Sequence, residues 1–505
     1  MTFTAPAFLF VFLPLCVLGF AIFGRFGRRS AIGFLGFMSL VFYAEWSTKF
    51  LLLLVGSILF NYTMSRLIAR AEGNDRAQTA WLTFGIVSNL LCLGYFKYFF
   101  PLLHFFTAVG LSHRDWGSVI LPLGISFFTF TQIAYLVDLS QGAAERESLI
   151  SYVLFVTFFP HLVAGPILHH KEIMPQLREE RRYGIDRADV GVGLAWFSLG
   201  LFKKLIVADN IVNLADKPFA DPRHLGLWGT WLGVLAYAMQ LYFDFSGYSD
   251  MAVGLARMFS IRFPFNFNSP YKAASIIDFW QRWHMTLTRY ITLYLYNPMA
   301  MSMSRRRIRQ GKKASKKAQR TLGGFTQIIA FPMITTMFLA GIWHGAGLQF
   351  ILFGLAHGIY LTINHIWRIF VPEDSRWQRL LPTPVGVLLT FACVLVGQVF
   401  FRAPSVDNAL SVFSGLAGRH GLGPGWQISQ FLIIAALLTI VWVMPNTQEI
   451  LGQTNPDDEP TWSLIRPRAW QPADIWWIAA FFGAAWAIAL AMLPLGYRPF
   501  IYFQF

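Results

Sequence analysis

Long apolar runs, separated by short polar breaks, recur along nearly the whole chain. Each run is about 20 residues long, which is the length that a helix needs to cross the hydrocarbon core of a bilayer. Two shorter spans are expected within 31–65, on either side of the polar stretch 45–49. The other expected spans lie near 6–24, 81–100, 118–138, 149–168, 190–214, 228–258, 323–342, 347–370, 383–401, 428–445 and 474–495. The pattern predicts roughly 11–13 transmembrane helices.

These runs predict an all-α, polytopic integral membrane protein. Strands of a membrane barrel are about half as long, and open sheet edges do not occur in hydrocarbon. The composition agrees, because 55% of the residues are hydrophobic and only 13% are charged. A soluble protein carries roughly twice that charged fraction. Residues 1–505 are therefore expected to form a single membrane domain, with most of the embedded polar residues in a core at 120–370.

The net charge of +15 is explained by the positions of the basic residues. Arg25, Arg28 and Arg29 follow the first span, and the segment 304–320 carries nine basic residues and no acidic one. Basic loops beside spans stay on the cytoplasmic side, which predicts a cytoplasmic loop at 302–322 and a periplasmic N-terminus. No nucleic-acid partner is needed to explain this charge. The loop could also attract an anionic acyl donor or anionic lipid head groups.

The segment 262–299 is too mixed in polarity for a lipid-facing helix. Three prolines, the last of them Pro298, bracket it, and 275–296 predicts a helix with one apolar face. Arg282 and His284 fall off that face. We expect a re-entrant or interfacial helix that lines a cavity.

Two histidines in apolar surroundings are the main candidates for chemistry. His344 lies in FLAGIWHGAGLQF, and His284 lies in QRWHMTL. A neutral imidazole can take a proton from a hydroxyl, and a polar residue so deep in an apolar run usually faces the protein interior. Glycines around His344, Gly341 and Gly345 among them, would admit either a neighbouring helix or a thin ligand. Simple packing and a proton relay in a transporter remain alternatives for both histidines.

Other polar residues are embedded in the core, including Asp138, Asn210, Asp244 and Ser246. A Ser-His-Asp set can be assembled from them on paper, but the chain has no G-x-S-x-G elbow to support it. The stretch HLVAGPILHH at 161–170 fits no common zinc spacing, so no metal site is expected.

The order of several motifs resembles the membrane-bound O-acyltransferase (MBOAT) family, in particular its bacterial alginate O-acetylation type. The resemblance covers essentially the whole chain. The matching stretches are PLGISFFTFTQIAYLVDL at 122–139, FFPHLVAGPI at 158–167, GLFKKLIVADN at 200–210, YFDFSGYSDMAVGLARMF at 242–259, FWQRWHMTL at 279–287, FLAGIWHGAGLQFILFGLAHG at 338–358, VFFRA at 399–403 and the closing FIYFQF.

The resemblance implies helices around a central tunnel in the bacterial inner membrane, with His344 as the catalytic residue and His284 as its companion. It implies no bound cofactor. Acetyl-coenzyme A or another acyl thioester would donate the acyl group at the cytoplasmic side, and a periplasmic esterase-like partner would place it on a polysaccharide. The residues expected to line the tunnel or touch substrate are Trp343, Trp283, Arg282, Asp244, Ser246 and Asn210.

The chain departs from the family pattern in three places. Members commonly carry an Arg-Asp pair where Thr292 and Leu293 precede Tyr294, and a Gly-rich loop where this chain has NPMAMSMSRRR at 297–307. His161 stands where a glutamine is frequent. The first two departures concern recognition of the donor or its carrier more than the chemistry. D-alanyl or other acyl transfer to a cell-wall polymer, and proton-coupled transport, are the alternative functions.

Overall fold

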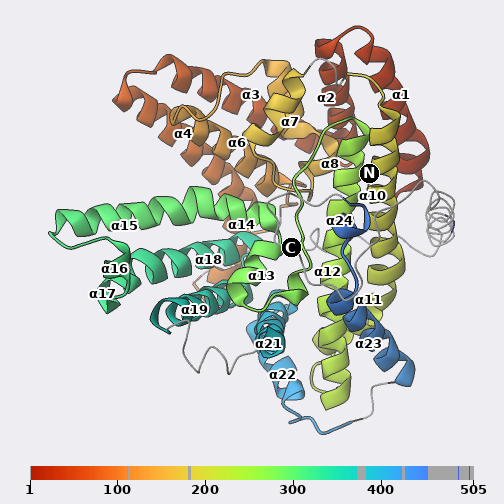
Figure 1. Cartoon of the computed structure of the whole chain (residues 1–505), viewed down its shortest axis with the longest axis vertical. Helices are drawn as coiled ribbons and strands as arrows, with labels where there is room; N and C mark the ends of the chain where they lie inside the picture. Colours follow the sequence, from red (N-terminus) through yellow and green to blue (C-terminus); the bar gives the residue numbers. More distant parts are fainter. Residues whose placement is uncertain are drawn as a thin grey trace. The chain divides into compact units, whose positions relative to one another are not determined.

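The regular elements in the part of the chain that the computed structural model describes are helices (Figure 1). That part comprises residues 2–179, apart from 109, 112–113, 115 and 118, together with 183–371, 383–423, 427–452 and the single positions 487 and 500. These residues contain no β-strand, and their one isolated β-bridge joins Phe267 to Trp283. The predicted all-α fold class is confirmed.

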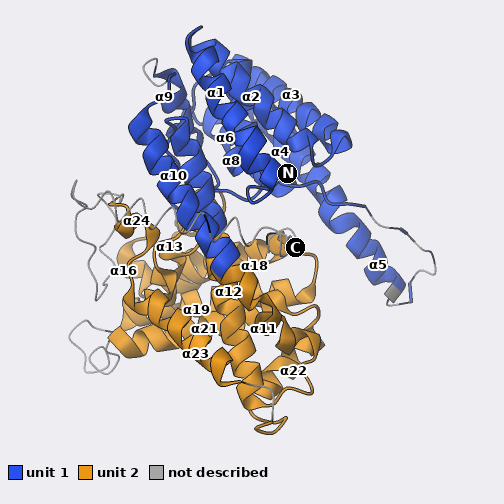
Figure 2. Ribbon diagram, turned by 90° about the vertical axis from the view of Figure 1, so that its right-hand side faces the viewer, with its two compact units in different colours: residues 1–206, 246–265, 473–504 blue, residues 207–245, 266–472, 505 orange. Residues whose placement is uncertain are grey.

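The described residues fall into two compact units (Figure 2). Unit 1 contains 2–206, 246–265, 487 and 500, and unit 2 contains 207–245 and 266–452, so the chain passes from one unit to the other after residues 206, 245 and 265. A single domain over 1–505 stays a prediction. The helices as far as residue 258 are η1 Phe8–Phe12, α1 Leu13–Gly24, α2 Arg28–Ala44, α3 Thr48–Arg70, α4 Asp75–Gly94, η2 Tyr95–Phe99, α5 Phe100–Ala108, α6 Ile125–Ser140, α7 Leu149–Thr157, α8 Phe159–Leu162, α9 His170–Arg178, α10 Arg187–Phe202, η4 Lys203–Ala208, α11 Asp209–Ala220 and α12 Leu227–Met258.

The remaining helices all belong to unit 2. They are η5 Pro270–Lys272, α13 Ile276–Arg282, α14 Met285–Ile291, η6 Thr292–Tyr296, α15 Asn297–Arg309, α16 Lys316–Gln319, α17 Leu322–Phe325, η7 Thr326–Ala330, α18 Phe331–His344, α19 Leu348–Phe370, α21 Thr383–Arg402, α22 Val406–Leu416, α23 Ile428–Val443 and α24 Thr447–Ile450. Of the elements labelled η, η5 is a 3₁₀ turn and the others are π-helical segments that continue their neighbouring α-helices.

Six helices in the described part are long and apolar enough to cross a membrane. They are Thr48–Arg70, Asp75–Thr107, Arg187–Ala220, Leu322–His344, Leu348–Phe370 and Thr383–Arg402. Phe8–Gly24, Ile125–Ser140 and Ile428–Val443 are shorter apolar helices. These positions agree with expected spans, whereas the span expected at 474–495 lies outside the described residues, apart from position 487. The total of roughly 11–13 transmembrane helices stays a prediction.

The span expected at 149–168 is wrong as a single helix. α7 has 9 residues and therefore reaches only about 13 Å. It ends at Phe158, whose ψ of 112° leaves the helical region, and α8 then begins with Pro160 in its first turn. Phe159 packs its ring against Phe8, Phe12 and Phe42. Part of this apolar run thus packs into an aromatic core within unit 1.

The single helix expected over 275–296 is also wrong, because the chain breaks at His284. The residue adopts a left-handed conformation, φ 45° and ψ 52°, between α13 and α14. Residues 266–268 hold the break from outside: the Asn268 N–H donates to the Arg282 carbonyl, and the Met285 N–H donates to the Asn266 carbonyl. Beyond it, α14, η6 and α15 follow without interruption, with Pro298 in the first turn of α15, where proline is tolerated.

The expected loop at 302–322 is largely helical, because α15 continues to Arg309 and α16 follows it. Arg307 is buried and donates to the carbonyls of Lys313 and Gly323 and to Gln327 Oε1. Its charge is therefore used to close this turn. Most of the other basic residues of the segment are exposed.

Two glycine pairs bring α10 and α12 into close contact within unit 1. A Cβ at Gly200 would lie 2.5 Å from the Gly247 carbonyl oxygen, and one at Gly254 would lie 2.5 Å from the Gly193 carbonyl oxygen. An ion pair between Arg257 and Asp189, 2.6 Å long, ties the same helices. Small residues of this kind let helix backbones approach closely in membranes.

Gly254→Ala is expected to destabilise the protein by about 1–3 kcal/mol, because the added carbon would press on backbone atoms that cannot rotate away. Thermal unfolding of the purified protein in detergent measures the effect. Gly191→Ala, on α10, is the matched control, since its Cβ would meet nothing within 4 Å. Equal melting temperatures for the two variants would contradict the prediction.

Candidate functional site

His284 occupies a strained and enclosed position in unit 2. The residue is 1% exposed, and its ring packs edge-on against the Phe245 ring, with 4.8 Å between the ring centroids. A left-handed backbone is uncommon for any residue other than glycine, so the surrounding contacts must hold it. His284 lies outside the candidate spanning helices, and burial lowers the pKa of its imidazole to about 3. The ring is therefore neutral at physiological pH.

Asn266 fixes which nitrogen of His284 carries the proton. Its Oδ1 accepts hydrogen bonds from the Thr286 N–H at 3.3 Å and from Thr286 Oγ1 at 2.9 Å. The same oxygen lies 3.0 Å from His284 Nδ1. Since an amide oxygen only accepts, Nδ1 must donate, and in a neutral ring Nε2 then carries the lone pair. The asparagine thus presents His284 Nε2 as a proton acceptor.

His344 is the last residue of α18 and is 6% exposed. Aromatic rings surround its imidazole: Trp343 at 4.6 Å, Phe401 at 5.0 Å and Phe353 at 5.7 Å between centroids. The helix ends there because Gly345 is fully extended, with φ −172°. The predicted deep placement of His344 is confirmed.

The glycines near His344 serve the packing of α18 against α19. A Cβ at Gly341 would lie 2.3 Å from the Phe350 carbonyl oxygen and 3.0 Å from the Gly354 Cα. A Cβ at Gly345 would lie 2.2 Å from the Phe350 ring. The sequence left two interpretations of these glycines, close approach of a neighbouring helix or of a thin ligand. These contacts support the first of them.

A third buried histidine, His357 on α19, links the two predicted motifs. Its ring lies 4.8 Å from Phe353, which also contacts His344, and 5.2 Å from Trp280 on α13. Trp280 Nε1 donates to His357 Nδ1 at 3.3 Å. We call His344, Phe353, His357 and Trp280 the aromatic shell.

The sequence did not single out His357 as a site residue. Its room is provided by Gly397 on α21, where a Cβ would lie 2.4 Å from His357 Nε2. Neither the tryptophan partner nor this glycine is near His357 in sequence, so only the FGLAHG stretch at 353–358 could have drawn attention to it. The sequence analysis also missed Asn266, because it lies 18 positions from its partner His284 in the sequence.

The other predicted site residues have different surroundings. Trp343 and Trp283 are buried, and the Trp283 ring stacks on Phe279 at 5.7 Å. Arg282 Nε donates to Asp278 Oδ1 at 2.6 Å, which commits its charge to an ion pair within α13.

The polar residues of α11 and α12 are not brought together as a set. Asp244 is 2% exposed and belongs to unit 2, whereas Ser246 is 1% exposed and belongs to unit 1. Two positions apart on a helix, their side chains cannot share a face. Asn210 is exposed on α11. The roles predicted for these residues in a tunnel stay predictions.

Comparison with known proteins identifies relatives over most of the chain. Residues 41–312 match the sequence model of the membrane-bound O-acyltransferase family. The chain is 38% identical to the peptidoglycan O-acetyltransferase of Helicobacter pylori, over 84% of this chain and 81% of that protein. It is 36% identical to the probable alginate O-acetylase AlgI of Pseudomonas aeruginosa, over 85% and 76% of the two chains.

Two further relatives indicate the breadth of the group. The probable alginate O-acetylase AlgI of Pseudomonas putida is 32% identical over the full length of both chains. The teichoic acid D-alanyltransferase of Streptococcus thermophilus is 25% identical over 56% of this chain and 69% of that protein. All four names describe transfer of an acyl group. With buried histidines in both motifs and a family match over more than half of its length, the chain belongs to the membrane-bound O-acyltransferase family.

Proposed function

We propose that this protein transfers an acetyl group from acetyl-coenzyme A, bound at the cytoplasmic side of the bacterial inner membrane, to an extracytoplasmic hydroxyl for O-acetylation of an exported polysaccharide. A periplasmic acetyltransferase partner would complete the transfer. The names of the relatives that share 30% identity or more support acetyl as the group and a polysaccharide as the final acceptor.

The reaction requires one proton to move. The acceptor hydroxyl oxygen attacks the thioester carbonyl carbon, the carbon–sulfur bond breaks, and the hydroxyl proton finally reaches the thiolate that leaves. A neutral imidazole can accept that proton and return it to the sulfur. We assign this role to His344, whose aromatic surroundings exclude water from the imidazole.

The observation that carries the proposal is the 3.0 Å contact between His284 Nδ1 and Asn266 Oδ1, from which the tautomer of His284 is assigned. Because Nδ1 donates to Asn266, Nε2 can accept a hydrogen bond from a hydroxyl but cannot donate one to a thioester carbonyl. His284 is therefore suited to holding the acceptor hydroxyl and is not suited to polarising the acyl carbonyl. That division complements a proton acceptor at His344.

The donor is tested with inside-out membrane vesicles that contain the protein, its partner and the polysaccharide. We expect acetyl-labelled coenzyme A to transfer its label to the polysaccharide, with release of one free thiol for each acetyl group. A D-alanyl thioester on a carrier protein is the second donor to supply, because one relative is named a D-alanyltransferase. Transfer from the carrier thioester alone would replace the acetyl proposal. Movement of solute or protons without either transfer would support a transporter instead.

A further inference from the structure

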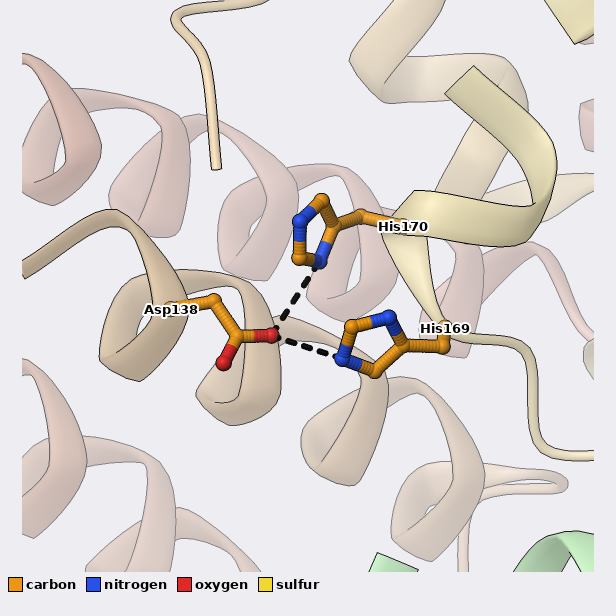
Figure 3. A group of neighbouring side chains, drawn as sticks. All are labelled: Asp138, His169 and His170. Atoms are coloured by element: carbon orange, nitrogen blue, oxygen red, sulfur yellow. Dashed lines mark ion pairs between the residues drawn. The ribbon is translucent and has the colours of Figure 1, made fainter. Parts of the chain in front are cut away.

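A carboxylate and two imidazoles meet in unit 1 (Figure 3). Asp138 lies near the end of α6, and His169 and His170 begin α9. Asp138 Oδ2 lies 2.8 Å from His169 Nε2 and 3.1 Å from His170 Nδ1. All three atoms lie within 4.8 Å of one another. The sequence analysis named Asp138 and the paired histidines separately and did not connect them, because the carboxylate comes from a different helix.

His170 is oriented for a ligand at Nδ1. Its side chain is 6% exposed, and its Nε2 lies 3.1 Å from the Ala143 carbonyl oxygen, which can only accept. Nε2 therefore carries a proton, and Nδ1 of a neutral ring carries the lone pair. Nδ1 makes no hydrogen bond with the described residues although it lies close to Asp138 Oδ2. In that tautomer the lone pairs of His170 Nδ1 and Asp138 Oδ2 face each other at 3.1 Å, and a cation between the two atoms would bind both.

The surroundings have the features of an outer shell around a metal. Histidines that bind metals usually donate their second ring N–H to a carbonyl or carboxylate, as His170 does to Ala143. The Ala143 N–H in turn donates to the Asp138 carbonyl at 2.8 Å, so the backbone of one residue contacts both Asp138 and His170. Arg178 at the end of α9 pairs with Glu145 at 2.7 Å and with Glu147. The junction between α6 and α9 is thus fixed before any ion binds.

His169 would have to give up two contacts for a metal bond: the hydrogen bond that its Nδ1 accepts, and the direct 2.8 Å contact of its Nε2 with Asp138 Oδ2. Its Nδ1 now accepts from the Lys171 N–H at 3.3 Å, which places the proton on Nε2. An ion at Nε2 moves that proton to Nδ1 and ends this hydrogen bond. The other half of the helix cap, the His169 N–H donating to Glu172 Oε2 at 3.0 Å, is unaffected. The side chain of His169 is 15% exposed, so the cluster is not completely closed to solvent.

We propose that Asp138, His169 and His170 bind a divalent transition-metal ion of the zinc type, which fastens the start of α9 to the end of α6. Imidazole and carboxylate ligands suit zinc. With bonds of about 2.0–2.2 Å, neighbouring ligands of a tetrahedral zinc ion lie about 3.3 Å apart, close to the two separations from Asp138 Oδ2. The ion holds the fold at this junction and takes no part in the transfer proposed above.

The test uses the full chain, purified in detergent with a tag that contains no histidine, stripped with a chelator and dialysed against Zn²⁺. Elemental mass spectrometry is expected to find about one zinc per chain, and zinc is expected to raise the melting temperature. Asp138→Asn and His170→Gln keep the side-chain size and are expected to lose the bound zinc and this thermal response. His224→Gln is the matched control, because His224 also contacts an aspartate, Asp221, but at an exposed site where the described residues offer no third ligand. It is expected to keep both.

A second measurement needs no variant. Co²⁺ can replace zinc, and its visible absorption bands report tetrahedral coordination by nitrogen and oxygen in the native protein. Absence of those bands together with absence of stoichiometric zinc would overturn the proposal, and the three side chains would then contact one another without an ion. Zinc retained equally by native protein, Asp138→Asn and His170→Gln would overturn it as well, since the ion would lie elsewhere.

Discussion

Replacing His344 by alanine is expected to lower the rate of acetyl transfer by about 10²–10⁴-fold, which is the usual contribution of a positioned acid or base. The loss should appear in kcat, because the imidazole acts on a proton that moves only during the reaction. Release of coenzyme A and labelling of the polysaccharide, at equal amounts of folded protein in vesicles, measure it. His344→Gln should lose as much, since an amide fills the space but does not take a proton.

His224→Ala is the control for this experiment, because the His224 side chain is 83% exposed and is expected to leave the rate unchanged. Unchanged melting temperatures would separate lost chemistry from lost structure, which matters because His344 packs against Phe353 and Phe401. A His344→Gln variant that folds and transfers acetyl groups at the native rate would rule out proton transfer by this residue. The aromatic shell would then be a packing unit.

Asn266→Ala is expected to lower the rate by about 10–100-fold, although Asn266 itself is placed only to position His284. Without the amide oxygen, the proton of His284 can move to Nε2, and the ring no longer accepts a hydrogen bond from the hydroxyl. Asn266→Asp keeps an acceptor for Nδ1–H and is expected to recover most of the rate. Because a carboxylate favours the charged ring, this variant should shift the acidic limb of the pH–rate profile to higher pH.

Asn268→Ala is the matched control, since Asn268 lies in the same segment and its Oδ1 accepts a hydrogen bond from Asn446 at 2.9 Å, not from a histidine. A purely structural role for Asn266 predicts a different result. In that case Asn266→Ala and Asn268→Ala would lose activity together with stability, and Asn266→Asp would leave the pH profile unchanged. The pH profile therefore distinguishes positioning from folding.

The spanning helices and the two motif histidines could be predicted from the sequence because both depend on local pattern. A run of about 20 apolar residues must satisfy its backbone internally in a bilayer, so the helices near 347–370 and 383–401 follow from composition alone. His344 stood out for the same reason, as a titratable residue in an apolar run. Its burial confirms that part of the prediction.

Two segments with helical patterns were not helices of the expected length. At Phe158 the chain turns into the aromatic core of unit 1, and at His284 it is held open by hydrogen bonds from 266–268. Periodicity reports which face of a segment is apolar, but it does not report what a distant segment offers to its backbone. Both errors therefore arise from tertiary contacts that override local preference.

The sequence by itself determined that this protein is an α-helical membrane protein and which two histidines carry its motifs. Only the tertiary structure decided that Asn266 sets the tautomer of His284, that His357 joins the aromatic shell, and that Asp138 meets His169 and His170. The physical reason is that hydrogen bonds and ligand sets are formed by residues that become neighbours only when the chain folds. Apolar length and local pattern, in contrast, are already complete in the unfolded chain.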